Sequence, residues 1–532
     1  MAVSSAQATV TDYYLHWGDM TIVRVTGVGQ YGVNKDLSRH ELPINVWTDA
    51  RNIRFYGDSA YQFFGHGEVY NSPSVAPQYC FPITIGTTRY WIYHSAAKSY
   101  IVTNSGGTAN HTDITHATPR TGTVNAWTHT IFGGIPVCNA GDGSKPMYWD
   151  LNLTHKFVDL TGWTATDTCK VVRSYKNFLV ALNITRSGTN KPHLVAWSQS
   201  SDIGALPTTW TSSSTNDAGE VDLAEAYSPI VDGLPLRDSF IIYTQDSTHR
   251  MDYVGGDSVM RFQKIMGMSG LLTTNCAVEF DGWHFAVTGS DVIIHDGVSA
   301  NSVLDNQARR DFFQSLDINN ISKTFVFKNP FLNEIFIAYC SIGSSVCDKS
   351  LVYNYKTKTV SYRDLPNVNH ANYGSISNEL IGSWSSNSDS WDSSITSWDG
   401  PDYTPDTARV MFASADIKLY LMDSSATFNG TIPTAYLERQ GLSFDTPESI
   451  KMIKGIRPRI TGNTGETITI SVGWADDPNT TPTYTSSSYT IGSLKADFFV
   501  SGRYLAIKFS NGTASQWRVD SYDIEIETMG AY

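Results

Sequence analysis

One pattern of apolar and polar residues recurs between about Thr87 and Ser425. Each copy has an apolar strand of β-branched and aromatic residues, a short turn rich in Gly, Ser, Asn and Asp, and a second apolar strand. This arrangement is the signature of a β-hairpin. Seven copies occur, at Arg89–Asn104, Phe132–Leu151, Asn177–Ser198, Ser239–Gly256, Trp283–Gly297, Glu334–Thr359 and Arg409–Ser425.

The spacing of the copies predicts the fold of this region. Successive copies begin about 45 to 75 residues apart, which leaves room for two further strands per copy. One four-stranded blade per copy predicts a β-propeller of six to seven blades, a fold that protects sheet edges by arranging its sheets around a ring. An irregular array of β-sandwiches is the alternative.

The pattern changes at about Thr434. Strict alternation of apolar and polar residues, separated by turns, predicts five strands, TITISVGWA, YTSSSYTIGS, ADFFVSG, RYLAIKFS and WRVDSYDIEIE. Such strands favour an antiparallel sandwich or platform sheet. We therefore predict an all-β chain with three parts: residues 1–86, a strand-rich segment that joins the propeller; residues 87–433, the propeller; and residues 434–532, the C-terminal platform.

An insert rich in Ser, Asp and Trp lies near residues 377–407. Trp384, Trp391 and Trp398 are seven residues apart, as on a helical heptad, but the residues between them are poor helix formers. A loop is the better interpretation, on a face where partner contacts are usually carried. Four aspartates could supply calcium ligands but do not fit the EF-hand spacing, so a solvated loop is favoured: Asp389, Asp392, Asp399 and Asp402.

Composition agrees with β-structure and narrows the class of protein. Of the 532 residues 41% are hydrophobic, 12% aromatic and only 17% charged. The net charge of −13 argues against a protein that binds nucleic acid tightly through its phosphate groups. We see no signal peptide and no apolar run long enough to span a bilayer. The six cysteines are scattered; Cys340 and Cys347 flank one hairpin turn, but reduced thiols are expected.

Motifs for chemistry are absent from the sequence. Gly27, Gly29 and Gly32 have the GxGxxG spacing, but no long amphipathic helix follows to hold a pyrophosphate, so a glycine-rich turn is expected. HExxH, GxSxG, P-loop and zinc spacings do not occur. His111 and His116 lie in a polar stretch where a surface role is the default. We nominate no catalytic, cofactor-binding or metal-ligating residue, and we expect a protein that is not an enzyme.

A basic segment opens the C-terminal part. Lys451, Lys454, Arg457 and Arg459 lie within about ten residues of one another. They either face a partner or pair with the acidic remainder of the chain, and the second is the usual case.

Three segments resemble one family. The string GVNKDLSRHELPINVWTDARNIRFYGDSAYQFFG (Gly32–Gly65) is similar to the N-terminal signature of the tail nozzle (tail tubular protein B-like) proteins of short-tailed bacteriophages. SWSSNSDSWDSSITSWDG (Ser383–Gly400) resembles the serial Trp-Asp-Ser segment of that family, although its first Trp lacks the Asp. The closing domain of the family is matched, in order, by Leu437–Gly462, Val472–Pro478, Val500–Ser510 and Trp517–Glu527.

The resemblance implies a virion structural protein. Members are built on a propeller, assemble as a homohexameric ring below the head-to-tail adaptor, and form the channel through which the genome is held and ejected. Tail fibres or tailspikes dock around the ring, and double-stranded DNA passes without specific binding. The expected location is the virion tail, after synthesis in the bacterial host cytoplasm. The alternative is a receptor- or glycan-binding propeller of the phage tail. A variant of this alternative is a glycan hydrolase that uses paired carboxylates. The Ser-x-Asp-x-Gly-x-x-Trp turns of sialidase-type propellers do not occur in the sequence.

Overall fold

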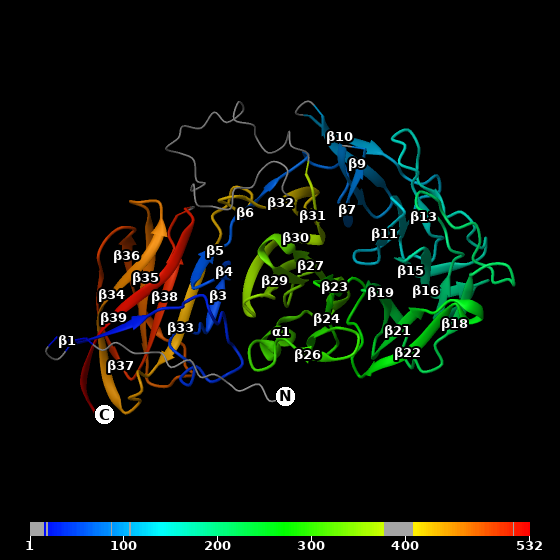
Figure 1. The fold of residues 1–532 in the computed structure, drawn as a ribbon. Helices are drawn as coiled ribbons and strands as arrows, with labels where there is room; N and C mark the ends of the chain where they lie inside the picture. Colours follow the sequence, from blue (N-terminus) through cyan, green and yellow to red (C-terminus); the bar gives the residue numbers. More distant parts are fainter. Residues whose placement is uncertain are drawn as a thin grey trace.

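The computed structural model describes residues 15–17, 20–86, 88–105, 108–376, 408–513 and 515–531. Within these ranges the protein is all-β, as the sequence predicts, and consists of small antiparallel sheets (Figure 1). The helices of the described residues are short: α1 (Arg309–Ser315), η1 (Gly256–Ser258), η2 (Ile321–Lys323) and η3 (Pro330–Leu332). None of these helices is long and apolar enough to cross a membrane.

Five four-stranded sheets follow one another along the chain, each made of four consecutive strands. The first two are β7 (Tyr79–Ile85), β8 (Thr88–His94), β9 (Ser99–Ser105) and β10 (Thr108–Asp113), then β11 (Thr128–Phe132), β12 (Ile135–Asn139), β13 (Met147–Tyr148) and β14 (Val158–Asp159). The third is β15 (Thr168–Tyr175), β16 (Phe178–Arg186), β17 (Thr189–Trp197) and β18 (Gly219–Asp222). The last two are β19 (Ile230–Leu236), β20 (Ser239–Thr244), β21 (Ser247–Tyr253) and β22 (Met260–Gly267), then β23 (Ala277–Phe280), β24 (Trp283–Val287), β25 (Val292–His295) and β26 (Ala300–Ser302).

A sixth, seven-stranded sheet joins distant parts of the chain. Its order is β27 (Phe325–Asn329), β28 (Glu334–Tyr339), β29 (Cys347–Asn354), β30 (Thr359–Gly374), β31 (Arg409–Ser414), β32 (Lys418–Ser425) and β6 (Gly65–Glu68). The long strand β30 pairs with β29 along its first part and with β31 along its second. The edge strand β6 comes from the N-terminal part of the chain and pairs with β32.

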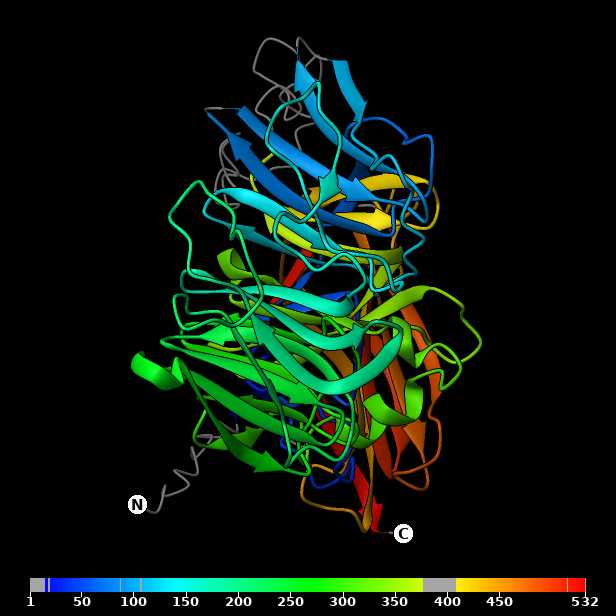
Figure 2. The same cartoon turned by 90° about the vertical axis from the view of Figure 1, so that its right-hand side faces the viewer.

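The first strands of these sheets contact one another in turn. The series runs from β11 to β15, β19, β23, β27 and β30, and from β30 to β7. Strand β7 in turn contacts β11, because the Tyr79 hydroxyl on β7 and His129 Nδ1 on β11 share a hydrogen bond of 2.7 Å. Figure 1 shows these strands around one centre, with the later strands of each sheet further out, and Figure 2 shows the sheets following one another from blue to green.

The predicted hairpins are confirmed as pairs of neighbouring strands within these six sheets. The seven copies correspond to β8–β9, β12–β13, β16–β17, β20–β21, β24–β25, β28–β29 and β31–β32, all antiparallel pairs. Their apolar residues pack between neighbouring sheets, for example Leu182 and Phe240 of one cluster. The hydrophobic pattern therefore marks the two strands that are buried on both faces.

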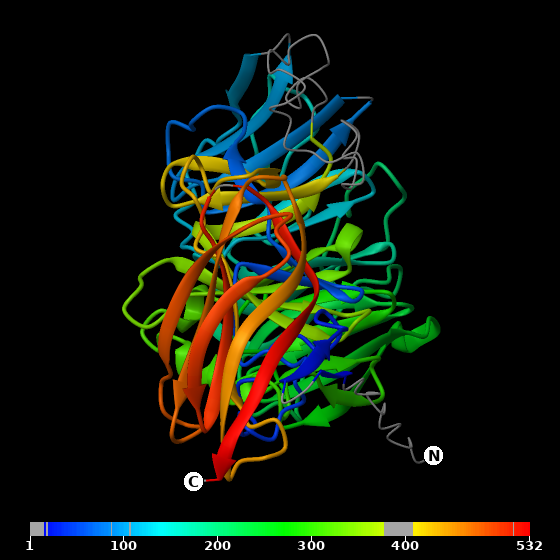
Figure 3. The same ribbon diagram turned by 90° about the vertical axis from the view of Figure 1, so that its left-hand side faces the viewer.

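Two further sheets enclose the largest hydrophobic core (Figure 3). One has the order β1 (Leu15–Trp17), β2 (Met20–Val25), β39 (Trp517–Ala531), β34 (Ser449–Gly462) and β37 (Ala496–Gly502), with β5 (Ser59–Gln62) pairing with β39 and with β4 (Ile53–Tyr56). The other has the order β3 (Asp49–Arg51), β33 (Tyr436–Leu442), β38 (Tyr504–Asn511), β35 (Thr467–Ala475) and β36 (Thr483–Thr490). The five strands predicted for this part are present as β35 to β39. We call these two sheets the C-terminal sandwich.

The N-terminal segment is divided between the two regions. Strands β1 to β5 belong to the C-terminal sandwich, and β6 belongs to the sheet of β32. Residues 1–86 were predicted as one segment that joins the propeller. The pairing of β2 with β39, which sets Met20 opposite Glu527, joins residues that no local pattern connects.

The insert near residues 377–407 lies outside the described residues. The predicted Trp-rich loop and the predicted solvated aspartates both fall in this range and stay predictions.

Candidate functional site

Buried polar side chains fill the centre where the first strands meet; we call this cluster the hub. Arg173 on β15 donates from Nε and Nη2 to the two carboxylate oxygens of Asp232 on β19, at 3.0 and 2.8 Å. Nη2 also donates to Asn275 Oδ1 at 3.1 Å. Arg173 and Asp232 are 8% and 0% exposed, so this ion pair is removed from water. A buried charge pair of this geometry fixes the relative positions of the strands that carry it.

Two asparagines extend the hub to neighbouring loops. The main-chain N–H of Asn275 donates to Asp232 at 3.0 Å, and its side-chain amide donates to Asn125 Oδ1 at 3.0 Å. The side-chain amide of Asn125 in turn donates to the carbonyls of Thr274 and Thr324, each at 2.8 Å. Each loop carbonyl that the fold buries at this point thus has a donor, as buried polar groups require.

Aromatic rings and neutral histidines occupy the remaining part of the hub. The His129 ring stacks on Phe81 at 4.2 Å between ring centroids, and His370 lies 3.9 Å from the Tyr79 ring. Burial lowers the pKa of His370 to about 3 and holds the pKa of His129 well below its ordinary value. Both imidazoles are therefore neutral at physiological pH.

The hub has the composition of a structural core. Its charged groups, Arg173 and Asp232, are buried and paired with each other. Among the described residues, no three His, Cys, Asp or Glu side chains lie close enough together to hold a metal ion. Sequence reasoning nominated none of these residues. The signal that could have found them is a charge next to apolar residues within a strand, as for Arg173 after VV and for Asp232 in PIVDGLPL.

A second buried ionic cluster, the junction, joins the C-terminal sandwich to the sheet of β27 to β32. Arg54 on β4 donates to Glu334 on β28 at 2.6 and 3.1 Å, and to Asp423 on β32 at 2.7 Å. Arg363 on β30 completes the cluster with a contact of 3.2 Å to Asp423. All four side chains are at most 8% exposed. Burial raises the pKa of Glu334 in spite of the opposing effect of Arg54.

The predicted glycine-rich turn is confirmed. Residues 26–32 form turns, and no helix follows them. A Cβ atom on Gly29 would lie 2.2 Å from the carbonyl oxygen of Ser59, and one on Gly32 would lie 2.8 Å from that of Val360. Glycine at these two positions lets the turn lie directly against the main chain at Ser59 and at Val360.

The basic segment pairs with the acidic face of the neighbouring strand, as expected. Lys454, Arg457 and Arg459 on β34 contact Glu527, Glu525 and Asp523 on β39, at 2.5, 2.5 and 2.8 Å. This ladder joins two paired strands of one sheet. Lys451, on the same strand, has a different environment, which is described below.

The remaining residues singled out in the sequence have local roles. His111 contacts the Tyr93 hydroxyl at 2.9 Å, and His116 lies 3.1 Å from Asp159. The Sγ atoms of Cys340 and Cys347 are 3.8 Å apart, and both thiols are free and buried.

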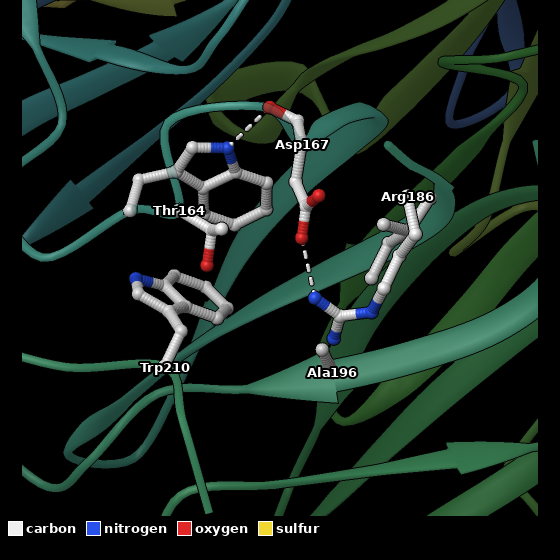
Figure 4. A pocket seen from close by; sticks show the side chains of 7 residues that line it. Thr164, Asp167, Arg186, Ala196 and Trp210 are labelled. Atoms are coloured by element: carbon white, nitrogen blue, oxygen red, sulfur yellow. Dashed lines mark hydrogen bonds and ion pairs between the residues drawn. The ribbon is translucent and has the colours of Figure 1, made fainter. Parts of the chain in front are cut away.

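A small pocket between Trp163 and Trp210 is a poor ligand site. The two indoles meet edge to face at 4.7 Å between centroids, and Asp167 forms an ion pair with Arg186 beside them (Figure 4). The cavity volume is about 10 Å³. That space is at the lower limit for one water molecule and excludes a sugar ring.

Comparisons with known proteins give distant likenesses. No family model matches the chain, and no curated protein matches it. Among solved structures, the chain is similar to PorZ, a bacterial surface component of the type-IX secretion system of Porphyromonas gingivalis, with 7% identity over 74% of this chain and 44% of PorZ, at a TM-score of 0.36. It is also similar to the extracellular domain of a putative one-component system of B. thetaiotaomicron, with 9% identity over 84% of this chain and 58% of that chain, at a TM-score of 0.38. A third similar structure is AztD from Citrobacter koseri, with 10% identity over 59% of this chain and 92% of AztD, at a TM-score of 0.30.

The chain thus spans less than two thirds of the length of the first two structures. At these identities neither an activity nor a partner carries over from them.

Proposed function

We propose that the six successive sheets form a seven-bladed β-propeller, to which the C-terminal sandwich is attached. The contacts between first strands, which lead from β11 back to β7, support a closed ring. In this interpretation β30 is the last strand of one blade and the first strand of the next. The N-terminal strand β6 is then the outer strand of the last blade, so the two ends of the ring are held in one sheet.

We further propose that the protein is a structural subunit of the tail nozzle of a short-tailed bacteriophage and not an enzyme. The observation that carries this proposal is the position of the family-like string Gly32–Gly65. Arg51 and Asn52 from this string contact Asp364, and Arg54 contacts Glu334, so its polar residues connect the sandwich to the propeller. Residues of this kind, paired between two regions of the chain, favour a role in architecture.

The filled hub determines where a genome channel would lie. Because Arg173, Asp232 and the asparagines occupy the centre of the ring, a DNA duplex has no path through one subunit. In the proposed hexamer the channel therefore lies between copies, around the symmetry axis of the assembly. The net charge of −13 supports a wall that does not hold phosphates.

The proposed partners follow from this role: further copies of the chain, the head-to-tail adaptor ring, tail fibres or tailspikes, and double-stranded DNA in transit. The location would be the virion tail. Docking of fibres or spikes would shift subunits against one another and release the genome.

The test is the mass and end-on symmetry of the purified protein, alone and mixed with the adaptor ring of the same virion. Light scattering and negative-stain imaging would give six-fold rings, either directly or on the adaptor. A protein that stays monomeric in the presence of the adaptor, and that binds or cleaves a glycan on an array, would overturn the proposal. The chain would then be a receptor-binding or glycan-hydrolysing propeller.

A further inference from the structure

A cavity of about 630 Å³ opens at one end of the C-terminal sandwich; we call it the end groove. Strands β2, β34 and β39 of one sheet and β33 of the other line it, together with the loops 40–44 and 443–446. Apolar side chains form much of the wall: Val23, Leu42, Leu442, Phe444 and Ile526. The volume and the lining are those of sites that hold small organic molecules, about 300 to 1,000 Å³.

Two cationic side chains of this wall have only main-chain partners. Lys451 Nζ donates to the carbonyls of Ser443 and Thr446, at 2.9 and 2.6 Å. Arg439 donates to the carbonyls of Arg39 and Leu42, at 2.8 and 2.6 Å, while its buried Nε–H has no acceptor. Neither cation forms an ion pair with a carboxylate of the described residues, although both are 1% exposed.

This arrangement is an exception within an acidic protein. Three other basic residues of β34 each pair with a carboxylate of β39. A buried cation without a counter-charge is costly. Burial accordingly lowers the pKa of Lys451 to about 8 and that of Arg439 to about 10. The lining also holds the carboxylates of Glu41 and Asp445, but neither forms an ion pair with Lys451 or Arg439 among the described residues. An anion in the end groove would give these two cations a counter-charge.

We propose that the end groove binds an amphipathic anion, a carboxylate carried on an apolar chain. The carboxylate lies against Lys451, whose ammonium has three donors of which two are used, and beside the cationic side chain of Arg439. The apolar chain packs along Phe444, Leu442 and Ile526. This site is independent of the proposed assembly, because it lies within one chain.

The test uses decanoate as the probe and the full chain as the binder, measured by titration calorimetry. Decanoate is expected to bind with one site per chain. Decanol, which has the chain without the charge, and acetate, which has the charge without the chain, are each expected to bind at least tenfold more weakly. Equal affinity for decanol, or no binding of decanoate at millimolar concentration, overturns the proposal.

Matched variants locate the site. Lys451→Met is expected to weaken decanoate binding at least tenfold, whereas Lys454→Met, which removes a paired lysine of the same strand, changes it less than twofold. If Lys451→Met fails to fold, Thr528→Glu serves instead, because Thr528 is an exposed residue of the lining and a carboxylate there repels the ligand. Unchanged decanoate affinity in folded Lys451→Met or in folded Thr528→Glu would show that the ligand does not bind in the end groove.

Discussion

The hub and the junction are both buried ionic clusters, but their carboxylates are stabilised differently. In the hub, Asp232 accepts main-chain N–H groups from Gly233 at 2.7 Å and from Asn275 at 3.0 Å, in addition to Arg173. In the junction, Arg54 is the donor to the Glu334 carboxylate among the described residues. A carboxylate with main-chain donors depends less on its cation. The junction is therefore expected to be the more fragile of the two when its cation is removed, whereas acid acts on buried neutral histidines in both regions, such as His370 in the hub and His66 beside Arg363 and Asp423.

Acid should produce the largest effect. Burial lowers the pKa of five imidazoles to about 3 or about 4: His66, His94, His284, His295 and His370. An unfolded histidine titrates near 6.5, so below that pH the unfolded chain binds more protons and the free energy of unfolding falls as the pH falls. Each group contributes up to about 1.4 kcal/mol per pH unit and about 1.6 kcal/mol between pH 6.5 and 5, so we expect a total loss of roughly 8 kcal/mol over this interval.

Urea unfolding at several pH values between 7.5 and 5 measures this loss. Ordinary carboxylates titrate below that window, which isolates the histidines. Glu334 at the junction, whose pKa burial raises, acts in the opposite sense and becomes easier to keep buried as the pH falls. A free energy of unfolding that stays flat from pH 6.5 to 5 would contradict the expectation.

Arg54→Met should be the most damaging substitution of the set. It leaves Glu334 buried without a donor, while Asp423 keeps Arg363. Loss of one member of a buried pair costs about 3 to 5 kcal/mol. The matched control is Arg51→Met, because Arg51 has a side chain 40% exposed in its pair with Asp364, and we expect a cost below about 1 kcal/mol.

A second change sharpens this result. Adding Glu334→Leu to Arg54→Met removes the stranded carboxylate, so most of the lost stability should return. A double variant no more stable than Arg54→Met would mean that packing, and not the uncompensated charge, is what the junction supplies.

Arg173→Met should cost less, about 2 kcal/mol, because Asp232 keeps its two main-chain donors. Chemical unfolding of this variant beside Arg54→Met compares the two clusters directly. Equal losses would show that the main-chain donors do not replace the cation.

Tyr243→Phe breaks a neutral network and should cost about 1 kcal/mol. The Gly297 N–H donates to His295 Nδ1, so His295 Nε2–H donates to the Tyr243 oxygen at 2.6 Å; the Tyr243 O–H then donates to His284 Nδ1 at 2.7 Å. Thermal unfolding measures the loss. Tyr148→Phe is the control, because the Tyr148 hydroxyl has no hydrogen bond within the described residues, and a similar loss there would count against the network.

Lys454→Met should have the smallest effect, below about 0.5 kcal/mol. Its pair with Glu527 is about one third exposed on both sides, where water and salt screen the attraction. Urea unfolding at low and high ionic strength should show the small difference disappear at high salt. A loss above 1 kcal/mol would show that the ladder between β34 and β39 acts as a cooperative network.

Local patterns predicted most of the strands and little of their assembly. The seven hairpins and the strands β35 to β39 follow from alternation and turn residues, which act within about twenty residues. The sandwich membership of β1 to β5 could not be predicted in this way, because β2, β3 and β5 join it through partners hundreds of residues away, as Arg24 does with Asp523. The same limit applies to the division of β30 between two sets of partners.

The clusters were missed for a related reason. Arg54 lies between Ile53 and Phe55, and Glu334 precedes the apolar run IFIAY. The sequence does not show that these two charges meet. Such isolated charges in predicted strands deserve to be treated as paired until a structure shows otherwise, since an unpaired one is costly to bury. The end groove had no sequence signal, because its lining comes from five separate segments.

The pairing of β6 with β32 affects how the chain is made. Glu68 is synthesised 352 residues before its partner Tyr420, and β2 waits even longer for β39. During translation the early strands remain without their neighbours, and a chain that stops before residue 418 leaves β6 and the sandwich core incomplete. Only a nearly finished polypeptide can close both regions. Prematurely terminated products would therefore present open sheet edges to chaperones and proteases, which offers the cell that makes the chain a simple way to discard them.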